Sequence, residues 1–351
     1  MTSREIVINT IRFKGAERLP YDFPEKYGSD FVWVGMSPSP DDRPRRGVDE
    51  WGAVWENIGE MSLGEVKDFP LKRWSDFDRL KIPDINEPRR WQAIKQVRAG
   101  HPDKFILAHG ISIYERVHFI RGLENTWMDI YDATENLGRL IDILVDMNLV
   151  AIRNYADAGI DGYIFPDDWG LQDKLMISPA AWRQIWKPRY ARIFEAAHRA
   201  GLLTFLHSCG HIVDILDDLI EIGLDVIHMD QQENMGIKLL GERFGGRITF
   251  FSPVDIQNTM VRGSLEDIRQ YCRDMATCLG RPNGGFIPRW YSDPIAAGHR
   301  PEAIDAMCEE FLLIAISHQL SALSEKNSQI VQEIPPEQIL NSDIRPKTIN
   351  E

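Results

Sequence analysis

Cysteine is scarce in this chain, which has four cysteines among 351 residues. So few thiols exclude the disulfide framework that small secreted domains use in place of a large core. Cys272, Cys278 and Cys308 fall within helical patterns, where we expect structural roles. Cys209 follows an apolar, strand-like run, and is therefore the cysteine for which we expect a chemical role.

Long apolar runs and an excess of positive charge are missing as well. No run approaches the roughly 20 apolar residues that span a bilayer, and the first residues contain no apolar signal-peptide core. These two absences predict a cytoplasmic protein without a membrane partner. The formal net charge of -13 argues against nucleic-acid binding, because such binding needs cationic side chains to neutralise phosphates.

A glycine-rich phosphate loop is also absent after every predicted strand, which weakens the nucleotide-binding version of an open α/β sheet. From about residue 100 onward, strand-like and helix-like segments alternate. Such alternation predicts parallel strands joined by right-handed helical crossovers. We therefore expect an α/β fold, a single (β/α)8 TIM barrel, with an open doubly wound sheet as the rival architecture.

The individual elements are predicted from the hydrophobic period of each segment. The predicted strands are Phe31–Gly35, Phe105–His109, Gly162–Phe165, Leu202–Leu206, Val226–Met229, Ile248–Phe251 and Phe286–Pro288. The predicted helices are Arg4–Phe13, Glu87–Ala99, Glu135–Ala158, Pro179–Ala200, Ile212–Ile222, Ile237–Phe244, Leu265–Leu279 and Pro301–Leu323.

Two segments lie outside this regular alternation. Residues 37–100 contain a stretch rich in Pro, Asp, Arg and Trp without clear periodicity, which is typical of an excursion or cap over an active site. Residues 325–351 are polar and contain a Pro pair, which predicts a flexible tail. We therefore expect the barrel with its N-terminal cap to occupy residues 1–324.

The most informative motif is the strand-like run 203–206, which ends in His207 and Cys209. Residues two apart on a strand point to the same side, so we expect the imidazole and the thiol to lie on the same side of the strand end. An imidazole and a thiolate together are half of a zinc site, and the carboxyl ends of strands carry the chemistry of α/β barrels. The alternatives are a hydrogen-bonded histidine and a small buried cysteine.

Polar side chains also follow the other predicted strands, and their concentration at one barrel mouth favours an enzyme. The candidate catalytic residues are Asp167, Asp168, His207 and Asp230. The candidate substrate-binding residues are His109, Glu115, Arg116, Gln172, Gln231, Asp255, Gln257, Arg289 and Tyr291. The alternative is that loops are polar in any case. Asp167, Asp168 and Asp255 could instead cap helices, and Glu115 could simply favour a helix dipole.

From about residue 100 to 323, the chain resembles the uroporphyrinogen decarboxylase-like superfamily. The resemblance is carried by His207-Ser208-Cys209-Gly210, then DDLIEIGLDVIHMDQQENM, GGRITFFSPVDIQNTM and GGFIPRWYSDPIAAGHRPEAIDAM. It implies a (β/α)8 barrel whose active site lies at the carboxyl ends of the strands. The superfamily contains porphyrin decarboxylases and corrinoid-dependent methyltransferases.

Two features separate these branches. The decarboxylases carry an Arg-Gln-Ala-Gly-Arg segment that grips porphyrin carboxylates, and here the first strand region, 31–36, reads FVWVGM instead. The His-x-Cys pair resembles the methyltransferase branch, in which the pair holds zinc with a later cysteine. This chain has Trp290-Tyr291-Ser292-Asp293 at that place. Asp293 or a carboxylate of another loop could supply an oxygen ligand; alternatively, the metal has been lost.

Residues 114–116 and 167–172 resemble the methyltransferase components of anaerobic O-demethylase systems. The resemblance implies transfer of a methyl group from a small methoxylated, aromatic substrate to the cobalt(I) corrinoid of a partner protein, with zinc activating the leaving oxygen. The chain has no Asp-x-His-x-x-Gly corrinoid motif, so a separate corrinoid protein must dock. Trp51, Trp55 and Trp74 could form part of that surface, with a structural role as the alternative. A homodimer is an open possibility.

Two other functions remain open at this point. One is a cofactor-independent decarboxylase or lyase, in which Arg116 and Arg289 would grip a carboxylate substrate. The other is a barrel that binds a ligand without catalysis. Metal analysis separates the lyase from the methyltransferase. Binding of a ligand without its turnover would indicate the barrel that has no catalytic activity.

Overall fold

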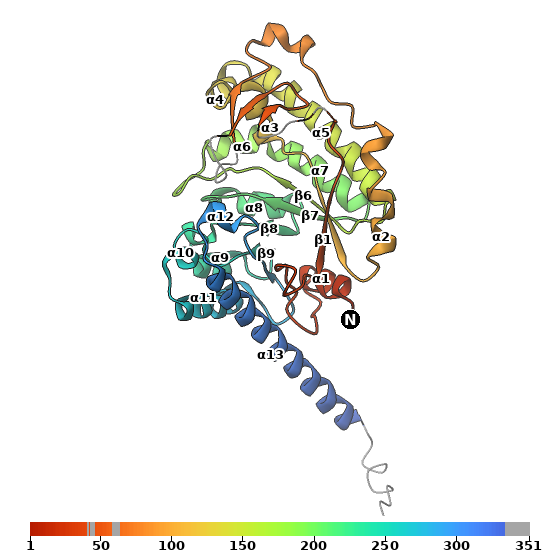
Figure 1. Ribbon diagram of the computed structural model, residues 1–351, viewed down its shortest axis with the longest axis vertical. Helices are drawn as coiled ribbons and strands as arrows, with labels where there is room; N and C mark the ends of the chain where they lie inside the picture. Colours follow the sequence, from red (N-terminus) through yellow and green to blue (C-terminus); the bar gives the residue numbers. More distant parts are fainter. Residues whose placement is uncertain (41, 43–45, 58–63, 334–351) are drawn as a thin grey trace, which may run out of the picture.

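A computed structural model describes residues 1–40, 42, 46–57 and 64–333 (Figure 1). Its centre is a curled parallel sheet that has seven strands in this described part. In spatial order the strands are β1 (Phe31–Gly35), β5 (Phe105–His109), β6 (Gly162–Pro166), β7 (Leu203–His207), β8 (Val226–His228), β9 (Thr249–Ser252) and β10 (Phe286–Pro288). All seven predicted strands are present with small shifts at their ends, so the predicted α/β barrel-like fold is confirmed.

The eighth strand position differs from the prediction. No ladder joins β10 to β1 in the described residues; instead Asp22 forms a parallel bridge with Arg289 and an antiparallel bridge with Ser29. The backbone of Asp22 accepts from Trp290 at 3.0 Å and donates to Pro288 at 3.1 Å. The neighbouring Pro20 and Pro24 have no N–H group to continue a ladder, so only a one-residue bridge can form here.

Alternate strand residues fill the interior of the barrel, as the two-residue period of a strand requires. The buried interior cluster consists of Phe31, Phe105, Leu107, Ile164, Leu203, Phe205, Val226, Phe251 and Ile287, together with Val7 and Ile11. Val7 and Ile11 belong to α1 (Ser3–Ile11), which therefore closes the amino end of the barrel. The same parity continues toward the carboxyl end with Trp33, His109, His207, His228 and Arg289.

Helices cover the outside of the sheet and pack on its outward-facing residues (Figure 1). They are α2 (Val97–Gly100), α3 (Tyr114–Arg121), α4 (Leu123–Asp132), α5 (Thr134–Asp157), α6 (Pro179–Ile185), α7 (Lys187–Arg199), α8 (Val213–Glu221), α9 (Ile237–Phe244), α10 (Thr259–Arg262), α11 (Leu265–Leu279), α12 (Pro294–Ala297) and α13 (Pro301–Glu333). The predicted helix Pro179–Ala200 is divided at Trp186, two residues before Pro188, which cannot donate a helical hydrogen bond. None of the described helices combines the length and apolar character needed to cross a membrane.

The predicted cap contains a small antiparallel sheet that the sequence did not reveal. Its strands are β2 (Gly47–Val48), β3 (Val54–Glu56) and β4 (Glu65–Asp68). The predicted helix Glu87–Ala99 is replaced by the 3-10 turns Pro88–Trp91 and Ile94–Gln96 and by α2. The indole N–H groups of Trp55 and Trp74 donate to Asp49 and Asp129, and Trp51 is buried. The three tryptophans therefore have structural roles.

The last helix, α13, is longer than its predicted range, Pro301–Leu323. Its first turns pack on α11, and its carboxyl half extends away from the barrel (Figure 1). Part of the predicted tail is thus helical up to Glu333, and residues 334–351 lie outside the described residues.

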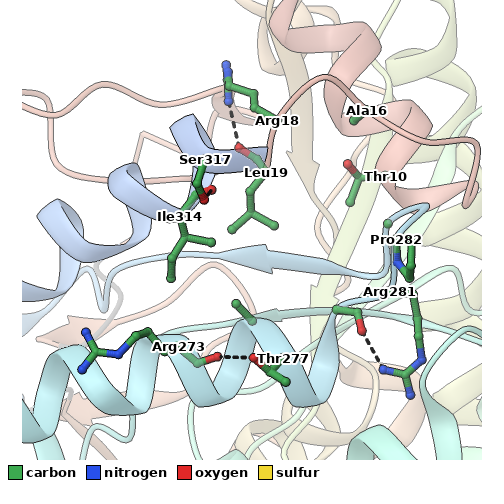
Figure 2. Close-up of a pocket in the computed structure, with 13 residues that line it drawn as sticks. Thr10, Ala16, Arg18, Leu19, Arg273, Thr277, Arg281, Pro282, Ile314 and Ser317 are labelled. Carbon is green, nitrogen blue, oxygen red and sulfur yellow. Dashed lines mark hydrogen bonds between the residues drawn. The ribbon is translucent and has the colours of Figure 1, made fainter. Parts of the chain in front are cut away.

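A pocket of about 760 Å³ lies between the chain after α1 and the helices α11 and α13 (Figure 2). Its lining includes Thr10 of α1 and Gly284, which precedes β10, so it lies at the amino end of the barrel. Arg281, which also lines it, donates to the backbone carbonyl groups of Cys278 and Gly280. This pocket is therefore at the end of the barrel opposite to the predicted site.

Candidate functional site

Asp168, His207 and Cys209 meet at the carboxyl ends of β6 and β7. His207 Nε2 lies 3.4 Å from Asp168 Oδ1 and 3.4 Å from Cys209 Sγ. The backbone N–H of Cys209 donates to Asp168 Oδ1 at 2.7 Å, which orients the carboxylate. All three residues are partly exposed, so a ligand can reach them from outside. The sequence prediction that His207 and Cys209 point to the same side is therefore confirmed.

Two glycines let the loops after β6 and β7 approach closely enough to form this cluster. A Cβ atom on Gly170 would clash with the backbone of Gly210 and His211, and one on Gly210 would clash with Gly170. Gly210 also has φ +76°, which a side chain rarely adopts. Backbone hydrogen bonds from Gly170 to Cys209 (3.1 Å) and from His211 to Leu171 (2.7 Å) join the loops. Main-chain contact thus fixes the separation of Asp168 and Cys209.

The donor atoms of Asp168, His207 and Cys209 all lie within 4.8 Å of one another. In a tetrahedral zinc site, Zn–N of about 2.0 Å and Zn–S of about 2.3 Å put neighbouring ligand atoms roughly 3.3–3.6 Å apart. The two 3.4 Å separations at His207 Nε2 match that range. One nitrogen, one sulfur and one oxygen donor form a set that suits zinc and leaves a fourth position for substrate.

The carboxylate of this donor set differs from the predicted one. Asp293 precedes α12 and accepts a hydrogen bond from the backbone of Ala296 at 3.3 Å, so its side chain caps that helix. It belongs to neither of the two donor groups in the described residues that could hold a metal ion. The carboxylate beside the His-x-Cys pair is that of Asp168, which comes from another loop.

A second group of donors shares His207. His207 Nδ1 lies 3.0 Å from His228 Nδ1, and His228 Nε2 lies 3.1 Å from Asp230 Oδ1. The guanidinium of Arg289 contacts the same His228 nitrogen. A fixed positive charge at that position disfavours a metal cation, so the group with Asp168 and Cys209 is the better metal site.

Burial and neighbouring charges shift the pKa values of His228 and Asp230 and so determine which of the two is ionised. Burial and then the charge of Arg289 lower the pKa of His228 to about 3. Burial works against ionisation of Asp230, but its interactions with His228, including their hydrogen bond, and the charge of Arg289 outweigh burial and lower the pKa of Asp230. At neutral pH the pair is a neutral imidazole beside an ionised carboxylate. Sequence reasoning missed His228, the last residue of β8, although it stands only two residues before Asp230, which follows the strand end.

Aromatic rings form a wall beside the two histidines. His109 stacks on Trp33 with ring centroids 5.0 Å apart and an angle of 27° between the planes. The guanidinium of Arg289 lies over the rings of Trp33 and Phe251, at 5.6 and 5.1 Å. Desolvation, together with the charge of Arg289, lowers the pKa of His109. Of these residues, His109 and Arg289 were predicted, whereas the first strand gave no sign of a site residue.

Two more predicted residues lie close to the cluster. Burial and the nearby charge of Asp230 raise the pKa of Tyr291, so its hydroxyl keeps its proton at neutral pH. Burial and the charge of Asp168 raise the pKa of Glu115 to about 8. Burial also raises the pKa of the Cys209 thiol. The cluster thus combines groups that keep their protons at neutral pH with side-chain atoms that could bind a metal ion.

Asp167 has a structural role instead of the predicted catalytic one. Its carboxylate is completely buried and accepts from the backbone of Tyr114 at 2.8 Å, Glu115 at 3.0 Å and Ile113 at 3.2 Å. It also accepts from the Tyr190 hydroxyl at 2.5 Å. Burial raises the pKa of Asp167 to about 7, and these donors oppose the rise. Its oxygens are occupied at the start of α3 and do not face a substrate.

Several predicted substrate-binding residues are likewise engaged within the protein. Asp255 is buried and accepts from the backbone of Gln257 and Thr259, so it holds the turn that leads into α10. The guanidinium of Arg116 pairs with Asp49 of the cap at 2.9 Å. These two side chains therefore stabilise the fold, which corrects their predicted role.

The three predicted glutamines have different surroundings. Gln231 accepts from the backbone of Gly210 at 2.9 Å, which supports the loop that carries Cys209. Gln172 is exposed and accepts from Asn234 at 3.2 Å. Gln257 is exposed, and its hydrogen bond to Asp255 is made by the backbone. The described geometry thus gives Gln231 a supporting role and brings neither of the other two into contact with the cluster.

Comparison with known proteins identifies the family and the fold of this chain. Residues 58–311 match the model of the family described as uroporphyrinogen decarboxylase (URO-D). A methyltransferase from Methanosarcina mazei has a similar structure, with a TM-score of 0.68 and 16% identity over 89% of this chain and 98% of that chain. A B12-independent methionine synthase from a Shewanella species has a TM-score of 0.44 and 12% identity over 62% of this chain and 65% of that chain, a weaker likeness.

None of the curated proteins that were compared matches the sequence. The family match nevertheless covers most of the chain, including β5 to β10 and the loops that carry Asp168, His207 and Cys209. The protein therefore belongs to the uroporphyrinogen decarboxylase family, as the sequence motifs predicted.

Proposed function

We propose that this protein is a methyltransferase that moves a methyl group from a small methoxylated aromatic substrate to the cobalt of a corrinoid on a partner protein. The observation that carries the proposal is the group formed by Asp168, His207 and Cys209. It provides oxygen, nitrogen and sulfur donors at the strand ends where barrels hold their substrates. The fold shared with the Methanosarcina mazei methyltransferase agrees with this reading.

Zinc is the cofactor for which this donor set is suited. Asp168, His207 and Cys209 would hold it, and the N–H of Cys209 would keep the Asp168 carboxylate in position. When bound, zinc supplies a Lewis acid that polarises the ether oxygen of the substrate. In the reaction the methyl–oxygen bond breaks and a methyl–cobalt bond forms. The electron pair stays on the oxygen, which must then gain a proton.

The chain's own residues provide the other requirements of this reaction. Tyr291 follows β10 at the same end of the barrel, keeps its proton at neutral pH and would donate a hydrogen bond to the departing oxygen. The stacked rings of Trp33 and His109 offer a flat surface on which an aromatic ring can pack. Asp230 and His228 support the Nδ1 side of His207, which leaves its Nε2 directed at Asp168 and Cys209.

The lyase alternative has less support from the side chains. It needs free cationic groups to grip a carboxylate substrate, and Arg116 is already paired with Asp49. Arg289 is buried and contacts His228, so its charge is only partly available. The methyltransferase reading requires neither arginine to be free.

We expect the protein to methylate a reduced corrinoid protein when a methoxylated aromatic donor is present. The measurement is the change in the visible absorption spectrum of the corrinoid, with phenol product measured in parallel. The control omits the methyl donor. If no methylated donor supports the reaction with the organism's corrinoid proteins, while the protein alone turns over a carboxylate, the lyase reading replaces this one. Donor binding without any turnover would indicate a barrel that only binds a ligand.

We also expect about one zinc per purified chain, and Cys209→Ala should lose most of it. Elemental analysis measures the metal, and Cys278→Ala serves as the matched control because Cys278 lies in α11, remote in sequence from the donor group. Equal zinc in the wild type and in Cys209→Ala would remove Cys209 from the site. Wild-type protein purified with zinc present but without bound zinc would remove the metal from the proposal.

A further inference from the structure

The helix α13 changes character where it leaves the barrel. In its first part, Ala303, Met307, Phe311 and Ala315 are buried on one side of the helix, and α11 packs there. On the same part, Leu313 and Ile316 are exposed by 61% and 52%. With 3.6 residues per turn, these two positions lie roughly opposite Phe311. An apolar stripe therefore begins on the side that faces away from the barrel.

The sequence continues this stripe along the part of α13 that extends from the barrel (Figure 1). Apolar residues recur in alternating steps of three and four at Leu313, Ile316, Leu320, Leu323 and Ile330, and Asn327 takes the remaining position. The positions that continue the barrel-facing side carry small or polar residues. They are His318, Ala322, Glu325 and Gln329. The apolar pattern is therefore not a continuation of the contact with α11.

We propose that this stripe pairs with the same stripe of a second copy of the chain in a parallel two-stranded coiled coil. Alternating steps of three and four are the a and d positions of a heptad repeat. Side chains at these positions pack between the side chains of a second helix that has the same heptad pattern. Asn327 then occupies an a position. An Asn at a meets its own counterpart only when two identical helices run parallel and in register, so it favours a second copy over an unrelated partner.

Charge and size agree with this assembly. The positions that flank the stripe are Ser317, Gln319, Ser324, Lys326, Val331 and Glu333. In a parallel pair, position 326 of one copy is opposite position 331 of the other, and the sequence has Lys at one position and Val at the other, so no like charges are paired there. The repeat from Leu313 to Glu333 spans only three heptads, so the interface would be small for a stable complex. We therefore infer a dimer whose population depends on concentration.

Sedimentation of the full-length protein over a range of concentrations tests the proposal. The wild type should show a monomer–dimer equilibrium, and Leu320→Glu with Leu323→Glu should raise the dissociation constant by at least about 100-fold. The control combines Ala322→Glu with Gln329→Glu, which adds the same charge on the other side of the same helix and should leave the equilibrium unchanged. A wild type that stays monomeric, or a dimer that both pairs of substitutions affect equally, would overturn the proposal.

The parallel arrangement has a separate test. Ile330→Cys places a thiol at a d position, where two copies meet only in a parallel, in-register pair. Mild oxidation should then give a disulfide-linked dimer, whereas Gln329→Cys should give little. Equal cross-linking of the two variants would contradict the arrangement. Asn327→Leu should strengthen association, since it removes the polar residue from the seam, and weaker association would also count against the proposal.

Discussion

The variant His207→Ala should transfer methyl groups about 10²–10³-fold more slowly than the wild type, because one electrophilic contact to a developing oxyanion is worth that much. His207 is the residue shared by both donor groups at the barrel mouth. Its loss would leave only Asp168 and Cys209 in the proposed zinc site. The measurement is the initial rate of corrinoid methylation at saturating donor, with zinc content determined on the same samples.

Two controls separate this effect from a loss of folding. His101 is exposed in the loop before β5, so His101→Ala should keep both rate and zinc content. Circular dichroism of His207→Ala should remain that of the wild type, because the imidazole is partly exposed and lies at the end of its strand. A rate within about 3-fold of the wild type, a difference far below the 10²-fold expected for a lost electrophilic contact, would exclude His207 from the chemistry.

The variant Asp167→Ala should lose about 3–5 kcal/mol of the free energy of unfolding. The substitution removes the acceptor for three backbone N–H groups at the start of α3 and for the hydroxyl of Tyr190. These donors are buried and would be left without partners. Equilibrium denaturation in urea gives the free energy, and Asp167→Asn should fall between the wild type and the alanine variant because it keeps one acceptor oxygen.

Asp168→Ala is the matched comparison for this prediction. The side chain of Asp168 is 37% exposed, so its removal should cost less than about 1 kcal/mol in stability. The same change should reduce zinc content and the rate of methyl transfer. A loss of stability with Asp168→Ala as large as with Asp167→Ala would contradict the division of roles between these adjacent residues.

The strands and the His-x-Cys geometry were predictable because both depend on the two-residue alternation of side chains along a strand, which can be read from neighbouring residues. Residues two apart on a strand share a side, and the turn glycine Gly210 follows directly, so His207 and Cys209 could be paired without knowledge of the fold. The short strands of the cap could not be predicted, since β2 has only two residues and its pairing depends on β3.

The roles of Asp167 and Asp168 depend on partners that are distant in the sequence. Tyr190 and the amino end of α3 decide that Asp167 is structural, and the loop after β7 decides that Asp168 joins the cluster. Neighbouring residues with identical side chains carry no local signal that separates them. For the same reason, Asp293 could not be distinguished from Asp168 as the carboxylate beside His207.

The contact between Gly170 and Gly210 has a consequence for engineering this barrel. Because two main chains touch there, the frame of the site is held mainly by the backbone and only in part by the side chain at position 168. The donor atoms can therefore be exchanged while the frame stays in place, for example through Cys209→His or Asp168→His. Insertions in either loop would separate the two positions. The barrel is thus a scaffold in which the donor set of the proposed metal site can be changed residue by residue, provided that the two glycines are kept.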